Sequence, residues 1–462
     1  MSVHQYRPVN GAASMPPPSG GGGRAPLNLV LGMAKPLITL VLGVAFVAGL
    51  AGGLARAQGI EVTAQDVANS FPDEIVFRLS VGSDADVQEV TVRYEILPDG
   101  VPAYGVPQFE PGRQVQVDFH LDANDGQLYL APGAEILYHW EIEDAAGNVV
   151  VTPGTTFVYQ DTRYEWVSAS EGAVSVHWYG DRDAESYLRV AADTLDRMSS
   201  LLGVEAIFPV KVWVYDDNDD MLAALPRRSQ GQEIERRTAG VRVASDTVLM
   251  LADGGGDILR HELTHVVTKV AGVGPYGDLP AWLDEGTAMY AQSEPGEGFT
   301  SALDGAVERD RLMSVRSMTS PTGDPDKVTL FYGEAWSLVS FMVNEYGEEK
   351  FAQLYAVFKD GSTTDNALQQ VYGFDQEGFE DAWRASLGLA PRQRATATPT
   401  PTATPAQPSP TATPTPGDGS QTEGEEDDVP WATAAALGAA GFAFVAVSLG
   451  GGVFLARRLR RR

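Results

Sequence analysis

The sequence contains no cysteine among its 462 residues. This absence excludes disulfide bonds, thiolate zinc sites and a cysteine nucleophile, so a bound metal would need histidine, aspartate or glutamate ligands. Histidine is also scarce, with six residues in the chain. Two of these histidines stand four positions apart in one short motif, which makes that motif the first candidate for chemistry.

Basic residues are few except at the two ends of the chain. Residues 1–57 carry four Lys and Arg and no acidic residue, and the last six residues carry five Arg. Once these nine are set aside, 24 basic residues remain against all 62 acidic residues. Such an acidic middle repels phosphate backbones, which argues against nucleic acid as a partner.

Two apolar runs bracket the chain. The run at 36–57 ends in Ala-Arg-Ala, which is typical of a signal peptide or, if uncleaved, of an N-terminal anchor. The run at 430–456 is long enough for a transmembrane helix and precedes the basic tail 457–462. Because positive residues mark the cytoplasmic side, we expect a cell-membrane protein, single-pass or double-anchored, whose middle is extracellular.

Two further segments have compositions that cannot build a core. Residues 1–35 are rich in Pro and Gly, which predicts a disordered cytoplasmic leader. Residues 393–429 alternate Thr and Pro and then become acidic, which predicts an extended stalk. The folded domains are therefore expected between residues 58 and 392.

Alternation of apolar and polar residues dominates residues 58–163. Four runs place apolar side chains on one face of a strand, at 75–81, 90–96, 115–121 and 136–142. Short strands at this spacing predict an N-terminal all-β sandwich. The stretch 140–148 is similar to the last hairpin of immunoglobulin-like or fibronectin-III-like modules.

Residues 164–392 form the second predicted domain, where the apolar period changes to that of helices from about residue 183. The pattern predicts an α+β, mostly helical domain. The acidic run 216–220 superficially resembles a calcium loop, but it lacks the glycine and the glutamate that such a loop needs. We interpret these carboxylates as caps of a helix, and His177 as structural.

The motif His-Glu-Leu-Thr-His at 261–265 is the most specific feature of the chain. Residues four apart lie on one face of a helix, so His261 and His265 can bind one zinc ion while Glu262 reaches its water. A third protein ligand is needed, and the sequence Trp-Leu-Asp-Glu-Gly at 282–286 offers Asp284 or Glu285. These two point about 100° apart on a helix, and we select Glu285 as the ligand.

This spacing resembles that of the gluzincin peptidases, and more closely the peptidase MA-like group related to the M1 metallopeptidases. The resemblance covers roughly residues 164–390 and implies a zincin-like fold with one Zn²⁺ ion. It implies that His261, His265 and Glu285 bind the metal, and that Glu262 is the general base. It also suggests an oxyanion-stabilising tyrosine on a later helix, for which Tyr332 is the best placed and Tyr290 is the weaker candidate.

These features predict an extracellular zinc metallopeptidase that hydrolyses peptide or protein substrates. The Gly-x-Met-Glu-Asn motif of the aminopeptidase members is missing before the zinc helix, so both endopeptidase and exopeptidase activity stay open. The predicted strand 247–251 offers an edge that could pair with a peptide backbone. The alternative is a non-catalytic surface-binding or adhesion protein that retains the peptidase fold.

Overall fold

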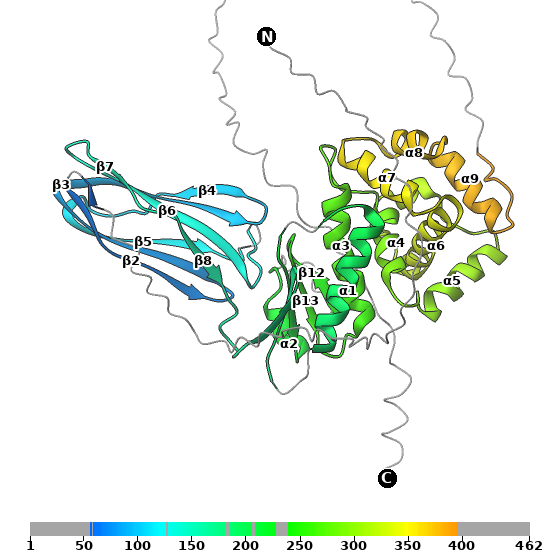
Figure 1. Cartoon of the computed structure of the whole chain (residues 1–462), viewed down its shortest axis with the longest axis horizontal. Coiled ribbons are helices and arrows are strands. Elements are labelled where there is room, and N and C mark those ends of the chain that lie inside the picture. Colours follow the sequence, from blue (N-terminus) through cyan, green and yellow to red (C-terminus); the bar gives the residue numbers. More distant parts are fainter. Residues whose placement is uncertain are drawn as a thin grey trace, which may run out of the picture. The chain divides into compact units, whose positions relative to one another are not determined.

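The computed structural model describes residues 56–57, 59–125, 128–180, 185–205, 208–227 and 239–394. The predicted leader, both apolar runs, the stalk and the basic tail fall almost entirely outside these residues. Within the described ranges, no helix has both the length and the apolar composition that crossing a bilayer requires. A β-rich region is followed by a mainly helical one, which confirms the predicted order of the two folded parts (Figure 1).

The β-rich region is an antiparallel network organised around one long strand, β3. Its strands are β1 (Arg56–Ala57), β2 (Ile60–Ser70), β3 (Glu74–Leu97), β4 (Val101–Gly105), β5 (Gly112–Asp122), β6 (Ala134–Asp144), β7 (Val149–Val151) and β8 (Thr155–Tyr159). The first half of β3 pairs with β2 and β5, and its second half pairs with β4 and β6. The predicted runs 75–81 and 90–96 are therefore one strand rather than two. The polar stretch between them shifts the register of pairing without ending the strand.

Two layers of this network enclose an apolar core. Phe77, in the first half of β3, has Val67 and Phe119 as its neighbours in the sheet. Its ring nevertheless contacts that of Tyr138 on β6, with centroids 4.9 Å apart, so this contact crosses from one layer to the other. Such face-to-face packing is the arrangement of a sandwich. The immunoglobulin-like assignment stays a prediction.

The second region begins with a five-stranded sheet in the order β12-β13-β11-β10-β9. These strands are β9 (Val167–Glu171), β10 (Val174–Trp178), β11 (Val210–Tyr215), β12 (Gly240–Arg242) and β13 (Thr247–Leu251). The predicted edge strand 247–251 is β13, and that prediction is wrong because β13 pairs with β11 on one side and β12 on the other. Among the described strands the edge belongs to β12, whose three residues are too few to give a strand signal in the sequence.

The remaining elements are nine α-helices and two short 3₁₀ helices within the described residues. They are α1 (Glu185–Leu202), α2 (Asn218–Ala223), α3 (Gly256–Gly272), α4 (Ala281–Ala291), α5 (Glu297–Glu308), η1 (Val315–Thr319), η2 (Pro325–Lys327), α6 (Val328–Tyr346), α7 (Glu348–Lys359), α8 (Thr364–Tyr372) and α9 (Gln376–Ser386). Asp217 caps α2 by accepting a 2.7 Å hydrogen bond from the backbone N–H of Asp219, which confirms the capping interpretation of this acidic run.

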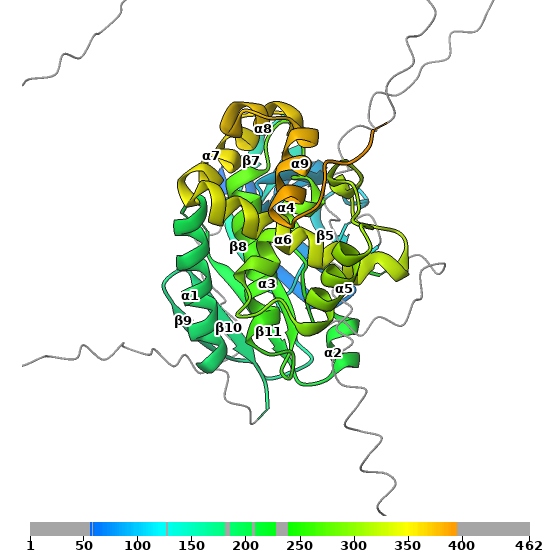
Figure 2. The ribbon, with the colours of Figure 1, turned by 90° about the vertical axis from the view of Figure 1, so that its right-hand side faces the viewer.

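The two faces of the sheet bury different side chains. Val212 and Val214 of β11 belong to the core that includes α1 and α3, whereas Trp213 and Tyr215 pack with Met221 of α2. Helices α1 and α3 lie side by side (Figure 2). The alternation along β11 therefore sets one face of the sheet against the helix that carries the His-Glu-Leu-Thr-His motif.

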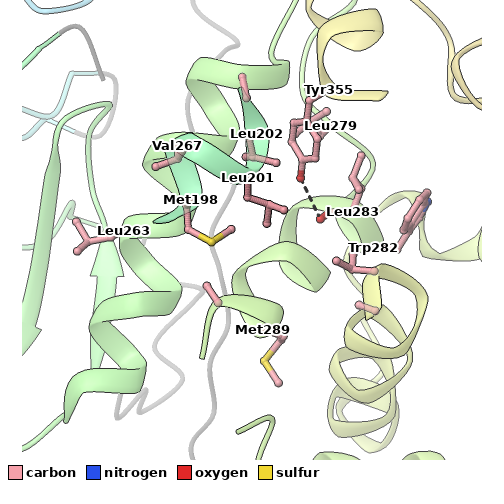
Figure 3. Close-up of a cluster of buried hydrophobic side chains, with 14 of the residues drawn as sticks. Met198, Leu201, Leu202, Leu263, Val267, Leu279, Trp282, Leu283, Met289 and Tyr355 are labelled. Carbon is pink, nitrogen blue, oxygen red and sulfur yellow. Dashed lines mark hydrogen bonds between the residues drawn. The ribbon is translucent and has the colours of Figure 1, made fainter. Parts of the chain in front are cut away.

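An apolar core joins α3 to α4 (Figure 3). Met198 of α1, Val267 of α3 and Leu283 of α4 are all buried in it. The hydroxyl of Tyr355 on α7 lies 3.5 Å from the carbonyl oxygen of Leu283, to which it donates a hydrogen bond. Because interiors are close-packed, this core fixes the positions of the two helices that carry the predicted metal ligands.

Candidate metal centre

The two motif histidines lie one turn apart on the same side of α3. His261 and His265 are both buried, and their ring centroids are 4.9 Å apart. Glu285 approaches them from α4. Its neighbour Gly286 lets α4 pack closely on α6, since a Cβ at this position would lie 2.3 Å from the carbonyl oxygen of Ala335. The structure thus brings together the three residues that the sequence predicted as ligands.

The distances between these three side chains suit a tetrahedral metal ion. Oε2 of Glu285 lies 3.3 Å from Nε2 of His261 and 3.6 Å from Nε2 of His265. All three ligand atoms lie within 4.8 Å of one another. Zinc binds such atoms at about 2.0–2.2 Å, and two tetrahedral ligands at that range are roughly 3.3–3.6 Å apart. The two carboxylate-to-imidazole distances match this spacing.

Five buried polar atoms at this place make no hydrogen bond to another described residue. They are Nε2 of His261, both ring nitrogens of His265, Oε2 of Glu285 and Oε1 of Glu262. Burying polar atoms without partners destabilises a fold unless something else satisfies them. Two imidazole nitrogens and a carboxylate oxygen are donors that zinc accepts. The residues present therefore fit a zinc ion, with Oε1 of Glu262 beside it.

Glu262 is fully buried, and the edge strand holds one of its oxygens. The backbone N–H of Arg242 donates a 2.9 Å hydrogen bond to Oε2 of Glu262. Strand β12 can approach α3 because residue 240 is glycine. A Cβ there would lie 2.5 Å from Cγ2 of Ile258 and 3.4 Å from Cγ of Glu262. Neither Arg242 nor Gly240 carries a sequence motif that would have identified this role.

Asp284 and Glu285 approach His265 at different nitrogens. Oδ2 of Asp284 lies 3.1 Å from Nδ1 of His265, and the hydroxyl of Thr268 donates a hydrogen bond to Oδ1 of Asp284. Burial by itself lowers the pKa of His265. The nearby carboxylates of Asp284 and Glu285 outweigh this effect and raise that pKa to about 9. Burial likewise opposes ionisation of Asp284, but His265 and Thr268 lower its pKa to about 2. Asp284 therefore orients the His265 ring, while Glu285 faces Nε2 of both histidines.

Gln292, which no sequence motif identifies, contacts the other histidine. Nε2 of its side-chain amide lies 3.0 Å from Nδ1 of His261, and a half-turn of the amide puts Oε1 there to accept the Nδ1 proton of a ring that ligates a metal through Nε2. Gln292 follows Glu285 by seven positions, which is about two helical turns, so both side chains leave the same side of α4. That spacing is the signal that could have pointed to it. Each ring thus has a polar partner at Nδ1.

Tyr332 lies on α6 and is buried. Its ring centroid is 6.3 Å from that of His261 and 5.9 Å from that of Phe299. This places the predicted oxyanion-stabilising tyrosine beside the histidine pair. Tyr290, the weaker candidate, is half-buried near the end of α4.

His177 of β10 makes structural contacts away from this centre. It stacks on Trp213 with ring centroids 4.3 Å apart, and its Nε2 lies 3.0 Å from Oγ of Ser175. Burial lowers the pKa of His177 to about 4. A neutral ring packed on tryptophan agrees with the predicted structural role.

Comparison with known proteins gives a family match for this part of the chain. Residues 190–388 match the model of the Peptidase MA superfamily. This segment contains the helices α3 and α4 that carry the candidate metal ligands. No curated protein matches the chain.

Similar solved structures include an aminopeptidase N family protein from Idiomarina loihiensis, at 12% identity over 70% of this chain and 75% of that one, with a TM-score of 0.34. OgpA from Akkermansia muciniphila is 14% identical over 22% of this chain, with a TM-score of 0.18. This chain covers 29% of the length of OgpA. The match of residues 190–388 to the Peptidase MA superfamily confirms the predicted resemblance at the level of the superfamily.

Proposed function

We propose that this protein is a zinc-dependent metallopeptidase that hydrolyses peptide bonds. The observation that carries the proposal is the group of buried atoms without hydrogen bonds, in which Oε2 of Glu285 lies from both imidazole Nε2 atoms at the spacing of tetrahedral zinc ligands. The superfamily match supports the same chemistry. A structural metal site would not need a buried carboxylate oxygen, Oε1 of Glu262, in addition to its three ligands.

In this proposal His261, His265 and Glu285 hold one zinc ion. Zinc held there supplies a Lewis acid that polarises the scissile carbonyl and lowers the pKa of the attacking water. Asp284 and the amide of Gln292 keep the two imidazole rings oriented through their Nδ1 atoms. The protein contributes a fixed ligand set on two packed helices.

Glu262 acts as the general base. Its Oε2 accepts the hydrogen bond from Arg242, so Oε1 is the oxygen that takes the proton of the attacking water. The same carboxylic acid then delivers that proton to the nitrogen of the leaving amine. A carboxylate fixed at one oxygen loses little orientational freedom when it reacts at the other.

Tyr332 is the proposed donor to the oxyanion that develops on the scissile carbonyl. Its ring lies beside His261, on the side of the centre formed by α6. Replacing Tyr332 with Phe keeps the packing against Phe299 and removes the hydroxyl. We expect kcat to fall about 10²–10³-fold with KM little changed, because such a donor acts mainly in the transition state.

We further propose that the peptidase domain is membrane-anchored and extracellular. The support is in the sequence alone, from the apolar run 430–456 and the arginine-rich residues after it. Intact cells that express the full chain should lose the 164–392 region on treatment with an added protease. The region should remain in the membrane fraction when cells are broken without detergent. Its recovery from the soluble fraction would contradict this localisation.

The activity is tested on the full chain with casein and a peptide library, with added zinc and with a chelator. Wild type should cleave only when zinc is present, and Glu262→Gln should retain zinc but lose cleavage. Peptides with free and acetylated amino ends distinguish exopeptidase from endopeptidase activity. Equal, metal-independent background from both proteins would favour the alternative, a surface-binding protein that retains the peptidase fold.

A further inference from the structure

The side chain of Arg242 leaves β12 on the side of the proposed zinc helix. Side chains alternate between the two faces of a strand, so residues 240 and 242 share a face. A Cβ on Gly240 would contact Ile258 and Glu262, both on α3. Val241, between them, packs instead on the opposite face with Trp213. The Arg242 side chain therefore starts beside the general base.

The Arg242 guanidinium has no hydrogen-bonded partner among the described residues. Its backbone N–H is bonded to Glu262, but its side chain makes no hydrogen bond or ion pair with a described residue, and it is half-buried. Lys269, by contrast, donates a hydrogen bond to Oγ of Ser245. A half-buried arginine without a hydrogen-bonded partner loses hydration that no described residue replaces. A planar guanidinium matches a carboxylate through two parallel hydrogen bonds.

We propose that Arg242 binds a carboxylate of the peptide substrate and so makes the enzyme selective for peptides that carry one beside the scissile bond. This proposal rests on the proposed peptidase function. Among the described strands β12 is the outermost of its sheet, so an extended peptide that lies beside it passes both Glu262 and Arg242. The carboxylate comes either from an acidic side chain or from the end of the substrate chain.

The test uses three matched peptide pools with the full chain. The first pool contains glutamate and has amidated ends, the second replaces that glutamate with glutamine, and the third is the second with free carboxyl ends. Wild type should prefer one of the carboxylate-bearing pools. Arg242→Gln should lower kcat/KM for that pool about 10–100-fold, the effect of losing a hydrogen bond to a charged group, and leave the second pool within about twofold. Arg242→Lys should recover part of the loss.

Two features of the design distinguish a loss of carboxylate binding from a general loss of catalytic geometry. Replacing the Arg242 side chain leaves its backbone N–H in place, so the contact with Glu262 survives. The matched control is Arg189→Gln, which removes one positive charge from an exposed position of α1 and should leave all three pools unchanged. A loss for the first pool alone assigns the site to acidic side chains, and a loss for the third alone assigns it to the terminal carboxylate. Equal losses for all pools, or none, would overturn the proposal.

Binding provides a readout that does not depend on turnover. Fluorescent peptides from the preferred pool and from the second pool are titrated into zinc-loaded Glu262→Gln, with and without Arg242→Gln. The added substitution should weaken binding of the carboxylate-bearing peptide alone. Cleavage of all pools at equal rates by wild type would overturn this inference and leave the peptidase function standing. No cleavage of any pool would count against the peptidase function, and the binding result would then decide the role of Arg242.

Discussion

The backbone N–H of Arg242 donates its hydrogen bond to Oε2 of Glu262, which joins the edge strand β12 to the helix α3 at the proposed general base. The other oxygen of this buried carboxylate has no hydrogen bond within the described residues. The orientation of Glu262 therefore depends on how closely a three-residue strand packs against the helix. That dependence gives the first prediction.

Gly240→Ala should reduce activity without removing the metal. The added Cβ would lie 2.5 Å from Cγ2 of Ile258, a β-branched side chain on α3 that cannot easily turn away. β12 must then move outward and lengthen the hydrogen bond to Glu262. We expect kcat/KM to fall at least about tenfold, since small displacements of a catalytic group are costly. Zinc content by mass spectrometry should be unchanged.

The control for this substitution is Gly298→Ala on α5, where an added Cβ meets nothing within 4 Å. It should leave activity at the wild-type level. Full activity in Gly240→Ala would show that the position of Glu262 does not depend on β12.

Glu285→Ala should weaken zinc retention and leave the fold largely intact. The substitution removes the only carboxylate oxygen that the described structure places near Nε2 of both histidines. Two imidazoles alone leave zinc short of protein ligands. Mass spectrometry of the protein after dialysis should show loss of most of the metal, while circular dichroism stays close to wild type. Glu294→Ala, at an exposed position beyond α4, serves as the control. Unchanged stoichiometry would assign the ligand role to Asp284 or to another carboxylate.

Gln292→Ala should lower zinc affinity about tenfold, the lower end of the range for residues that support a metal ligand. Its amide lies 3.0 Å from Nδ1 of His261, and its loss frees that ring to turn. Gln292→Glu replaces the amide with a carboxylate of similar shape, so it should retain wild-type affinity. Competition with a fluorescent zinc chelator measures both variants. Equal affinity of Gln292→Ala and wild type would show that packing alone orients His261.

Glu334→Gln should flatten the dependence of stability on pH. Burial raises the pKa of Glu334 to about 8, although the backbone N–H of Met313 and nearby arginines oppose this shift. In the unfolded chain this carboxyl loses its proton above about pH 4.3. The folded state then binds more protons than the unfolded state between these two values. The free energy of unfolding should therefore fall as pH rises from about 4.5 to 8, by at most about 1.4 kcal/mol per unit.

Chemical denaturation of wild type, Glu334→Gln and the exposed control Glu349→Gln at pH 5, 6.5 and 8 checks this sign. The Glu334→Gln variant should gain stability relative to wild type as pH rises, whereas the control should run parallel to wild type. Parallel curves for all three proteins would mean that Glu334 ionises in the folded state at its ordinary pH.

The local features of the centre could be predicted from the sequence. A helical period places His261 and His265 one turn apart whatever the rest of the fold does. The same reasoning indicates that only one of Asp284 and Glu285 faces the metal. The predictions that failed involve strands: β13 was expected at an edge, and β3 was expected as two strands. Strand pairing is a contact between distant segments, and the alternation of side chains does not specify which segments pair.

By itself the sequence determined which metal ligands are available: nitrogen and oxygen atoms, with no thiolates. The period of one helix also determined that His261 and His265 lie one turn apart. Only the tertiary structure decided which carboxylate meets both imidazoles, which strand holds Glu262, and that Gln292 and Arg242 lie at the same centre. The reason is physical. Neighbours along a helix are set by backbone geometry, whereas the approach of β12, α3 and α4 depends on how their side chains fill the space between them.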